Sequence, residues 1–384
     1  MIQIKVTSKC CGCYACSNVC PKNAIIMKED EEGFKYPNVD EKKCHRCNLC
    51  ETVCPIANKK KITNNEPKAY ACINNNETIR KQSSSGGIFT LIAEEILNQG
   101  GVVFGAKFND NFDVVHSFVE KKNDLKLFRG SKYVQSQIGD CYIKTKEFLE
   151  NDRYVLFTGT PCQIDGLYSY LQKDYNKLYT QDIICHGVPS PMVWKKYKDY
   201  RKKIDKDIPK NIDFRNKDNG WKNFNLKIQY NETNSYKKDQ TKDMYMKAFL
   251  SNLILRPSCY NCKCKNYNRK SDITLADFWG INYVLPKMND NKGTSLVIVN
   301  SEKGKWLFEK IKGKMKYEQV SIEEALKYNP SMVTSAKENP KRKEFFDMLS
   351  NSSFDRAVNK CIPEENIIKK IIKKVLRKIT ETIK

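Results

Sequence analysis

The chain has 384 residues, enough for two or three domains, and a formal net charge of +23 from 68 basic and 45 acidic side chains. Such a charge raises nucleic acid as a partner, but the lysines are spread along the chain without any nucleic-acid-binding signature, so an acidic redox partner or anionic lipid is the better expectation. No apolar run approaches the length of a membrane span or a signal peptide, which predicts a cytoplasmic protein.

The spacing C-x-x-C-x-x-C-x-x-x-C-P occurs twice near the N-terminus. It is the bacterial ferredoxin pattern, in which the fourth cysteine of each run reaches the other cluster. The spacing predicts that a first 4Fe-4S cluster is held by Cys10, Cys13, Cys16 and Cys54. It predicts that a second is held by Cys44, Cys47, Cys50 and Cys20.

Two plainer structures would use the same cysteines. A zinc module would place them in pairs rather than in triplets followed by a fourth cysteine and a proline. A disulfide knot is typical of secreted chains, for which nothing in this sequence argues. We therefore predict an α+β ferredoxin-like di-cluster domain over residues 1–60 that stores and relays single electrons.

A polar, basic stretch closed by Pro67 follows and predicts a linker over residues 61–68. A buried strand is expected at 69–73. The sequence SSSGG at 83–87 then precedes a helix at 88–97. A serine cap and two glycines at a helix start leave N–H groups open to a phosphate, although plain helix capping explains the same residues.

Further strand and helix patterns alternate after this point. Strands at 102–108 and 112–119 form a predicted hairpin, and a helix is expected at 139–150. Between them, RGSKYV at 129–134 presents cations and a hydroxyl beside small residues. Its lysine either faces a phosphate or is an ordinary surface lysine.

Two cysteines stand just beyond predicted strands. A buried strand leads to Thr160 as a helix N-cap and Pro161 as the first helical residue, so Cys162 lies in the first helical turn, where the pKa of a thiol is lowered. A second strand, at 178–184, is followed by Cys185. In an open α/β sheet, the carboxyl edge of the strands is where ligands bind.

A close group of cysteines, at 259, 262 and 264, precedes the stretch 271–280, which predicts a strand ending in an aromatic turn. A pair from this group would complete a four-thiolate site at the sheet edge. We therefore predict a third 4Fe-4S cluster on Cys162, Cys185, Cys259 and Cys262. Five cysteines remain as predicted bystanders, although Cys264 is able to replace Cys259 or Cys262: Cys11, Cys72, Cys141, Cys264 and Cys361.

Seven stretches, in order, resemble the coenzyme F420 hydrogenase/dehydrogenase beta-subunit family: SSSGGIFTLIAEEI, RGSKYVQS, LFTGTPCQIDGL, DIICHGVPSP, RPSCYNCKCK, SDITLADFWGI and GTSLVIVN. The resemblance implies an α/β flavin-binding domain, placed here at 69–350, with FAD, one 4Fe-4S cluster and hydride exchange between FAD and the deazaflavin coenzyme. The spelling of CHGVPSP and DFWGI is similar to a bacterial branch often found in polysaccharide loci.

The resemblance also implies the site residues and partners. The cysteines of TPCQ, CHG and CYNC would hold the cluster of this domain. A small-molecule hydride donor or acceptor and a redox partner protein are the implied partners. Ten residues would line the FAD: Ser84, Ser85, Gly86, Gly87, Ser131, Lys132, Tyr133, Gly159, Thr160 and Pro161.

These features predict an iron-sulfur flavoprotein oxidoreductase that couples hydride transfer at FAD, with coenzyme F420 or another organic substrate, to single-electron transfer through 4Fe-4S clusters. The alternative is a non-catalytic electron-transfer subunit that serves a partner enzyme, for example in polysaccharide biosynthesis. The C-terminal tail, 351–384, is basic and amphipathic over 367–383. It is expected to contact an anionic membrane, to dock on the protein or to meet a partner helix.

Overall fold

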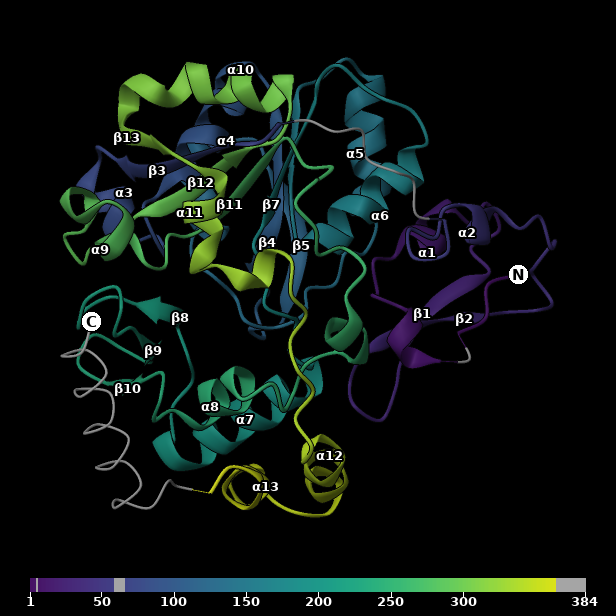
Figure 1. Ribbon diagram of the computed structural model, residues 1–384. Helices are drawn as coiled ribbons and strands as arrows, with labels where there is room; N and C mark the ends of the chain where they lie inside the picture. The colour runs from purple at the N-terminus through teal and green to yellow at the C-terminus, as the bar shows by residue number, and fades with distance from the viewer. Residues whose placement is uncertain (5, 59–65, 364–384) are drawn as a thin grey trace.

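The computed structural model describes residues 1–4, 6–58 and 66–363. It shows a small N-terminal domain beside a central sheet with helices on both faces, and a third region of helices and short strands next to that sheet (Figure 1). The predicted amphipathic segment 367–383 and most of the predicted linker lie outside the described residues. In the part of the chain that is described, no helix is long and apolar enough to cross a bilayer.

The N-terminal domain is a two-stranded antiparallel sheet with short helices. Ile25 pairs with Val39 at one end of the sheet and Glu29 with Lys35 at the other. Its elements are η1 (Thr7–Lys9), α1 (Ala15–Val19), β1 (Ile25–Glu29), β2 (Lys35–Val39) and α2 (Leu49–Thr52).

The central sheet has eight strands in the order β13-β3-β12-β11-β7-β6-β4-β5. Four neighbours in the middle, β11, β7, β6 and β4, run parallel, while β5, β12, β3 and β13 pair antiparallel, so the sheet is mixed. The predicted hairpin is confirmed as β4 and β5. The strands are β3 (Lys68–Asn74), β4 (Val102–Phe108), β5 (Val114–Val119), β6 (Val155–Thr158), β7 (Leu178–Ile183), β11 (Ile273–Asp277), β12 (Ser295–Val299) and β13 (Met315–Val320).

Helices cover both faces of this sheet because its strands are apolar on both sides. In β6, Leu156 belongs to the core under α4 (Ile88–Asn98) and α10 (Glu302–Ile311), while Phe157 belongs to the core under α5 (Cys141–Glu150) and α6 (Pro161–Leu171). Shorter elements surround the sheet: α3 (Glu77–Lys81), η2 (Lys122–Leu127), α9 (Ile281–Val284), η4 (Pro286–Met288), η5 (Lys312–Lys314), α11 (Ile322–Lys327) and η6 (Pro330–Met332).

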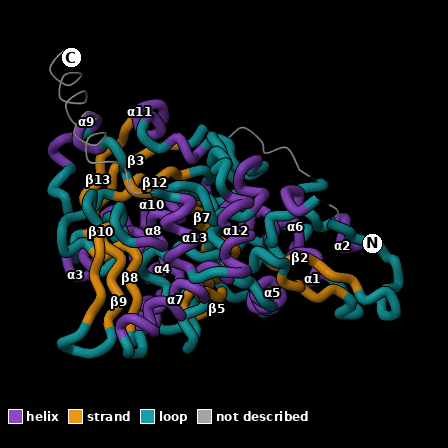
Figure 2. Tube along the Cα trace, turned by 90° about the horizontal axis from the view of Figure 1, so that it is seen from below, coloured by secondary structure: helices purple, strands orange, loops and turns teal. Residues whose placement is uncertain are grey.

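The third region contains a three-stranded antiparallel sheet in the order β10-β9-β8, which Figure 2 shows from below. This region has its own aromatic core. Trp194, Phe214 and Tyr245 form the centre of this core. Phe354, in the predicted tail, also packs here. The elements are α7 (Pro191–Asp205), β8 (Asn211–Asn216), β9 (Asn225–Gln229), β10 (Ser235–Asp239), α8 (Met244–Leu250), η3 (Pro257–Asn261), α12 (Arg342–Asn351) and α13 (Phe354–Cys361).

The end of α8 determines where the following cysteines lie. This helix ends at Leu250. The chain then turns, and Leu255 forms an isolated antiparallel bridge with Pro189, just after β7. This bridge brings the 259–264 cysteines to the edge of the central sheet.

The N-terminal domain docks on α6 through α1. Gly166 of α6 permits this close contact, since a Cβ atom there would stand 2.8 Å from the Cβ of Cys13 and 2.8 Å from the Tyr142 hydroxyl oxygen. The first cysteine run is therefore packed against the same helix that begins with Pro161.

Candidate functional site

Two cavities in the N-terminal domain divide its eight run cysteines into two sets of four. Each set contains three cysteines of one run and the fourth cysteine of the other. The first cavity is lined by Cys10, Cys13, Cys16 and Cys54. The second is lined by Cys20, Cys44, Cys47 and Cys50. These are the groupings that the spacing predicts.

The two runs share a backbone that wraps around these cavities. Gly12 and Tyr14 in the first run, and Arg46 and Asn48 in the second, all have positive φ, between 54° and 68°. Each left-handed residue reverses the chain locally, so the cysteines on either side turn toward a common centre. A non-glycine residue in this conformation costs about 1 kcal/mol or more, and it persists where a site requires it.

The two sets of four cysteines do not have the geometry of a site for a single metal ion. Within the described residues, no three His, Cys, Asp or Glu side chains lie close enough together to hold one metal ion. A 4Fe-4S cube bonds each cysteine through a different iron, so its ligands stand further apart than the ligands of one ion. All seventeen cysteines are free thiols, so a disulfide knot is also not the arrangement found.

A third cavity lies where the domains meet. It is lined by the four cysteines predicted for a third cluster, and by two predicted bystanders, Cys11 and Cys264. Cys162 follows β6 and Cys185 follows β7, so neighbouring parallel strands deliver two of the thiols to one edge. The loop after Leu255 delivers the others.

The charge around the third cavity suits an anionic group. Its described lining includes Lys9, Lys263, Lys265 and Arg269 and no acidic residue. The Lys265 ammonium donates to the carbonyl oxygen of Cys185 at 2.8 Å. A cube with four thiolates carries about two negative charges, which these cations would offset. The residues present therefore fit a 4Fe-4S cluster.

One expectation about Cys162 is wrong. Its position in the first turn of α6 is as predicted, with Thr160 as N-cap and Pro161 as the first helical residue. However, a hydrogen bond with Cys11 and burial raise the pKa of the free Cys162 thiol well above its ordinary value. The prediction from the helix start is wrong because Cys11 comes from the N-terminal domain. The sequence around Cys162 carries no information about that contact.

The pKa values of the neighbouring thiols shift in different directions. Burial raises the pKa of Cys259 to about 12 and that of Cys185 well above its ordinary value. In contrast, a hydrogen bond with Cys264 lowers the pKa of Cys262. The thiolate form is therefore favoured at Cys262 rather than at Cys264.

A fourth, larger cavity of about 670 Å³ opens at the carboxyl edge of the central sheet. Its size falls in the range of cofactor sites. Gly86 and Pro161 do not line it; Pro161 lines the third cavity instead. The other eight residues that the resemblance places near FAD line it together: Ser84, Ser85, Gly87, Ser131, Lys132, Tyr133, Gly159 and Thr160.

The serine-glycine loop of this cavity does not cap α4 as predicted. Gly87, with φ of 82°, is the N-cap residue, and no side chain caps the helix. The serines bond elsewhere: the Ser84 hydroxyl accepts from the Ser131 backbone N–H at 2.7 Å, and the Ser85 hydroxyl donates to the Thr294 carbonyl at 2.8 Å. The two loops expected near FAD are thus joined directly.

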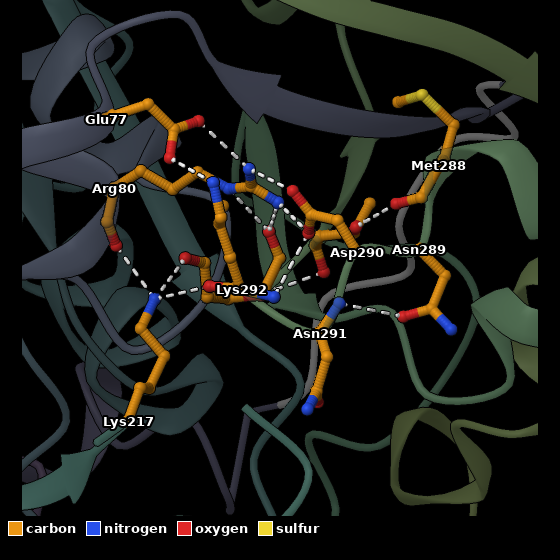
Figure 3. A network of polar contacts seen from close by, with 12 residues as sticks. Glu77, Arg80, Lys217, Met288, Asn289, Asp290, Asn291 and Lys292 are labelled. Atoms are coloured by element: carbon orange, nitrogen blue, oxygen red, sulfur yellow. Dashed lines mark hydrogen bonds and ion pairs between the residues drawn. The ribbon is translucent and has the colours of Figure 1, made fainter. Parts of the chain in front are cut away.

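A polar network behind the loop fixes its position (Figure 3). The Arg80 guanidinium, 2 % exposed, forms two hydrogen bonds to Asp290, of 2.7 and 2.6 Å, and two to the Gly293 carbonyl. The Lys217 ammonium donates to the carbonyl oxygens of Arg80, Ser85 and Lys292. Burial lowers the pKa of Lys217 to about 8.

Lys132 is not an ordinary surface lysine. Its ammonium is held among the carbonyl oxygens of Phe128, Arg129 and Gly130, at 3.1 to 3.3 Å. Burial lowers its pKa to about 8, against a raising effect from Asp213. The cavity therefore has a cation whose charge is sensitive to pH near neutrality.

Three buried polar atoms of the cavity lining have no hydrogen-bond partner among the described residues: His116 Nδ1, Gln181 Oε1 and Arg215 Nε. Burial lowers the pKa of His116 to about 4, so its ring is neutral, and its Nε2–H donates to the Thr158 carbonyl at 3.0 Å. Buried polar atoms are normally bonded. A polar cofactor such as FAD would supply such partners, so the lining fits it.

Sequence patterns gave no sign of the ion pair at this edge. Asp277, the last residue of β11, accepts two hydrogen bonds from Arg215, at 2.8 and 2.9 Å, and one from the Trp221 indole at 2.6 Å. Arg215 also donates to the Tyr133 hydroxyl at 3.2 Å. No local pattern links residues so far apart in the chain.

Three of these four cavities adjoin one another. The first ferredoxin cavity and the third cavity share Lys9, Cys11 and Ile56. The third cavity and the large cavity share the run from Cys185 to Val188. These three cavities therefore form a continuous series.

Two family models match consecutive parts of the chain. Both describe the beta subunit of coenzyme F420 hydrogenase/dehydrogenase: its N-terminal part matches residues 69–141, and its C-terminal part matches residues 152–325. The chain belongs to the coenzyme F420 hydrogenase/dehydrogenase beta-subunit family. A 4Fe-4S dicluster domain model matches residues 9–58, so this beta-subunit-family chain carries an iron-sulfur domain in front.

Relatives match parts of the chain. One subunit of the F(420)H(2) dehydrogenase of Methanosarcina mazei is 25% identical over 164 residues, 40% of this chain and 46% of that protein. A ferredoxin of Methanocaldococcus jannaschii is 47% identical over 47 residues, 12% of this chain and 60% of that protein. The chain spans about half the length of the curated relatives it matches. A protein chain of the F420-reducing NiFe hydrogenase complex from Methanosarcina barkeri matches with a TM-score of 0.45 and 16% identity, covering 76% of this chain and 89% of that chain.

The prediction that the fourth cysteine of each run binds the cluster of the other run can be tested in a variant that lacks the first three cysteines of the second run. Replacing Cys44, Cys47 and Cys50 by Ala should leave one ferredoxin-type electron paramagnetic resonance signal. Adding Cys54→Ala should remove that signal, because Cys54 lines the first cavity, while adding Cys20→Ala should not. The opposite result for the last two variants would show that each run holds its own cluster.

Proposed function

We propose that this chain is an iron-sulfur flavoprotein oxidoreductase that couples hydride transfer with an organic substrate to single-electron transfer through 4Fe-4S clusters. FAD, when bound, supplies the change from a two-electron to a one-electron step. The observation that carries the proposal is the wall from Cys185 to Val188, which belongs both to the large cavity and to the third cavity. A flavin and a cluster in those cavities would be neighbours.

The chain's own residues would bind and orient the flavin. Ser84 and Ser131 join the two loops, and Gly130, with φ of 84°, has open space where a side chain would stand. Lys132 supplies positive charge for an anionic cofactor, whereas Arg215 is paired with Asp277 and His116 is neutral. The organic substrate, coenzyme F420 or another hydride carrier, would reach the same cavity.

The second ferredoxin cavity is the proposed point of exchange with a redox partner protein. Cys47 is exposed, in contrast to Cys50, which is buried. Lys22 and Arg46 line this cavity, and no described lining residue is acidic. An acidic redox protein would find complementary charge there.

The proposed activity is tested with anaerobically reconstituted protein. The chain should retain flavin and should oxidise a reduced deazaflavin or nicotinamide donor, with the ferredoxin signals appearing as the flavin absorbance changes. These coupled changes require the flavin and the clusters in one chain. Reduction of the clusters by a partner protein, in a chain that binds no flavin, would instead establish an electron-transfer subunit without its own catalysis.

Iron analysis tests the third cluster. Fully reconstituted protein should hold about twelve irons per chain, and Cys162→Ala about eight, with the ferredoxin signals unchanged. Cys72→Ala is a matched control, because Cys72 is fully buried in the core of the central sheet and lines none of the three cysteine cavities. Eight irons in the wild type, or an equal loss in both variants, would reject the third cluster.

The pH dependence of flavin binding tests Lys132. Its pKa of about 8 in the free protein means that the ammonium is largely lost by pH 9, so FAD affinity should fall about tenfold between pH 7 and pH 9. Lys132→Met should bind more weakly at pH 7 and show no such fall. The variant Lys222→Met, at another lysine of the cavity lining, should keep the wild-type slope in fluorescence titrations. A slope retained in Lys132→Met would remove this residue from the flavin site.

A further inference from the structure

Arg256 connects the third cavity to the ferredoxin domain through its backbone and its side chain. The backbone N–H donates to the Val188 carbonyl at 2.9 Å, and the Arg256 carbonyl accepts from the Cys259 N–H at 2.9 Å. Both partners line the third cavity. The backbone of Arg256 is therefore part of the frame that holds the cysteines of that site.

The side chain of Arg256 crosses into the N-terminal domain, where it is completely buried. Its Nε donates to the Cys10 carbonyl at 2.8 Å, and Nη2 donates to the Lys35 carbonyl at 3.0 Å and lies 3.7 Å from Cys10 Sγ. Nη1 donates to Gln135 at 3.0 Å, and the guanidinium lies 4.2 Å from the Tyr36 ring centroid. One side chain thus touches both sides of the interface and a predicted cluster ligand.

The charge of this guanidinium is not neutralised by an acidic side chain. Over the described residues, no carboxylate forms an ion pair with Arg256, whereas the buried Arg215 and Arg269 pair with Asp277 and Asp182. A buried charge without an opposite charge is strongly unfavourable. The nearest group able to carry negative charge is the cysteine set of the first ferredoxin cavity, through Cys10.

We propose that Arg256 is a positioning residue that raises the reduction potential of the cluster held by Cys10 and fixes that cluster against the third cavity. Each electron that this site accepts adds one negative charge and no proton. A fixed positive charge in a low-dielectric interior stabilises the reduced form, and an N–H directed at a ligand sulfur acts in the same direction. The proposal rests on the dicluster domain and on Cys10 as a ligand, and it needs neither the flavin nor the third cluster.

Arg342 provides a matched control. Like Arg256, it is a buried arginine that links the two domains: it donates to Glu32 at 2.6 Å and to the Leu255 carbonyl at 3.1 Å. In the described structure its hydrogen bonds reach no cysteine. Arg342→Met therefore weakens the same interface without removing charge from a cluster site.

The test is an anaerobic redox titration of the full chain, followed by electron paramagnetic resonance, with iron content measured alongside. The midpoint of one ferredoxin cluster should fall in Arg256→Met and fall less in Arg256→Lys, which keeps the charge but not the fork of donors. The other cluster, and both clusters in Arg342→Met, should keep their wild-type midpoints. An unchanged midpoint in Arg256→Met, or an equal fall in Arg342→Met, would overturn the proposal.

Two further outcomes are also decisive. If Arg256→Met does not assemble the cluster, Arg256→Lys decides alone: a lowered midpoint supports the role of Arg256, and a wild-type midpoint rejects it. Wild-type protein without ferredoxin signals would overturn the cluster assignment and this proposal together. A wild type that binds no flavin but shows both ferredoxin signals would reject only the proposed hydride chemistry.

Discussion

The third cavity of this chain depends on the contact between the ferredoxin domain and the central sheet domain. Neither domain alone forms the third cavity, because Cys11 comes from one and Cys162 from the other. The close approach of α1 to α6 is possible because Gly166 has no side chain. The guanidinium of Arg256 is buried at the same domain interface. Packing at this contact therefore sets the relative positions of the cysteine groups.

Within the larger domain, the parallel order of the central strands concentrates chemistry at one edge. β6 leads to Gly159 and Cys162, β7 leads to Cys185, and β11 ends at Asp277. Adjacent parallel strands end side by side, so residues far apart in sequence become neighbours without any long loop. The antiparallel strands β12, β3 and β13 extend the sheet and support Ser85 from behind through Thr294.

Local spacing predicted the parts of the site that depend on a few residues. Such local patterns indicated the two cysteine runs, the start of α6 at Pro161 and the position of Cys185 after a strand. The rest depends on distant contacts. The burial of Lys132 and the raised pKa of Cys162 arise from groups elsewhere in the chain, and propensity or periodicity carries no information about them.

The buried cations link cofactor binding to stability. Lys132, Lys217 and Lys265 are held by backbone carbonyl oxygens, and Arg256 by carbonyls, an amide and a thiol, so each keeps a charge with only partial compensation. Such charges cost folding free energy unless an anion offsets them. Thiolate-bound clusters and a cofactor phosphate are such anions. Cofactors that bind only the folded chain would stabilise the fold by mass action, and the same charges that weaken the empty protein would make the loaded sites selective for anions.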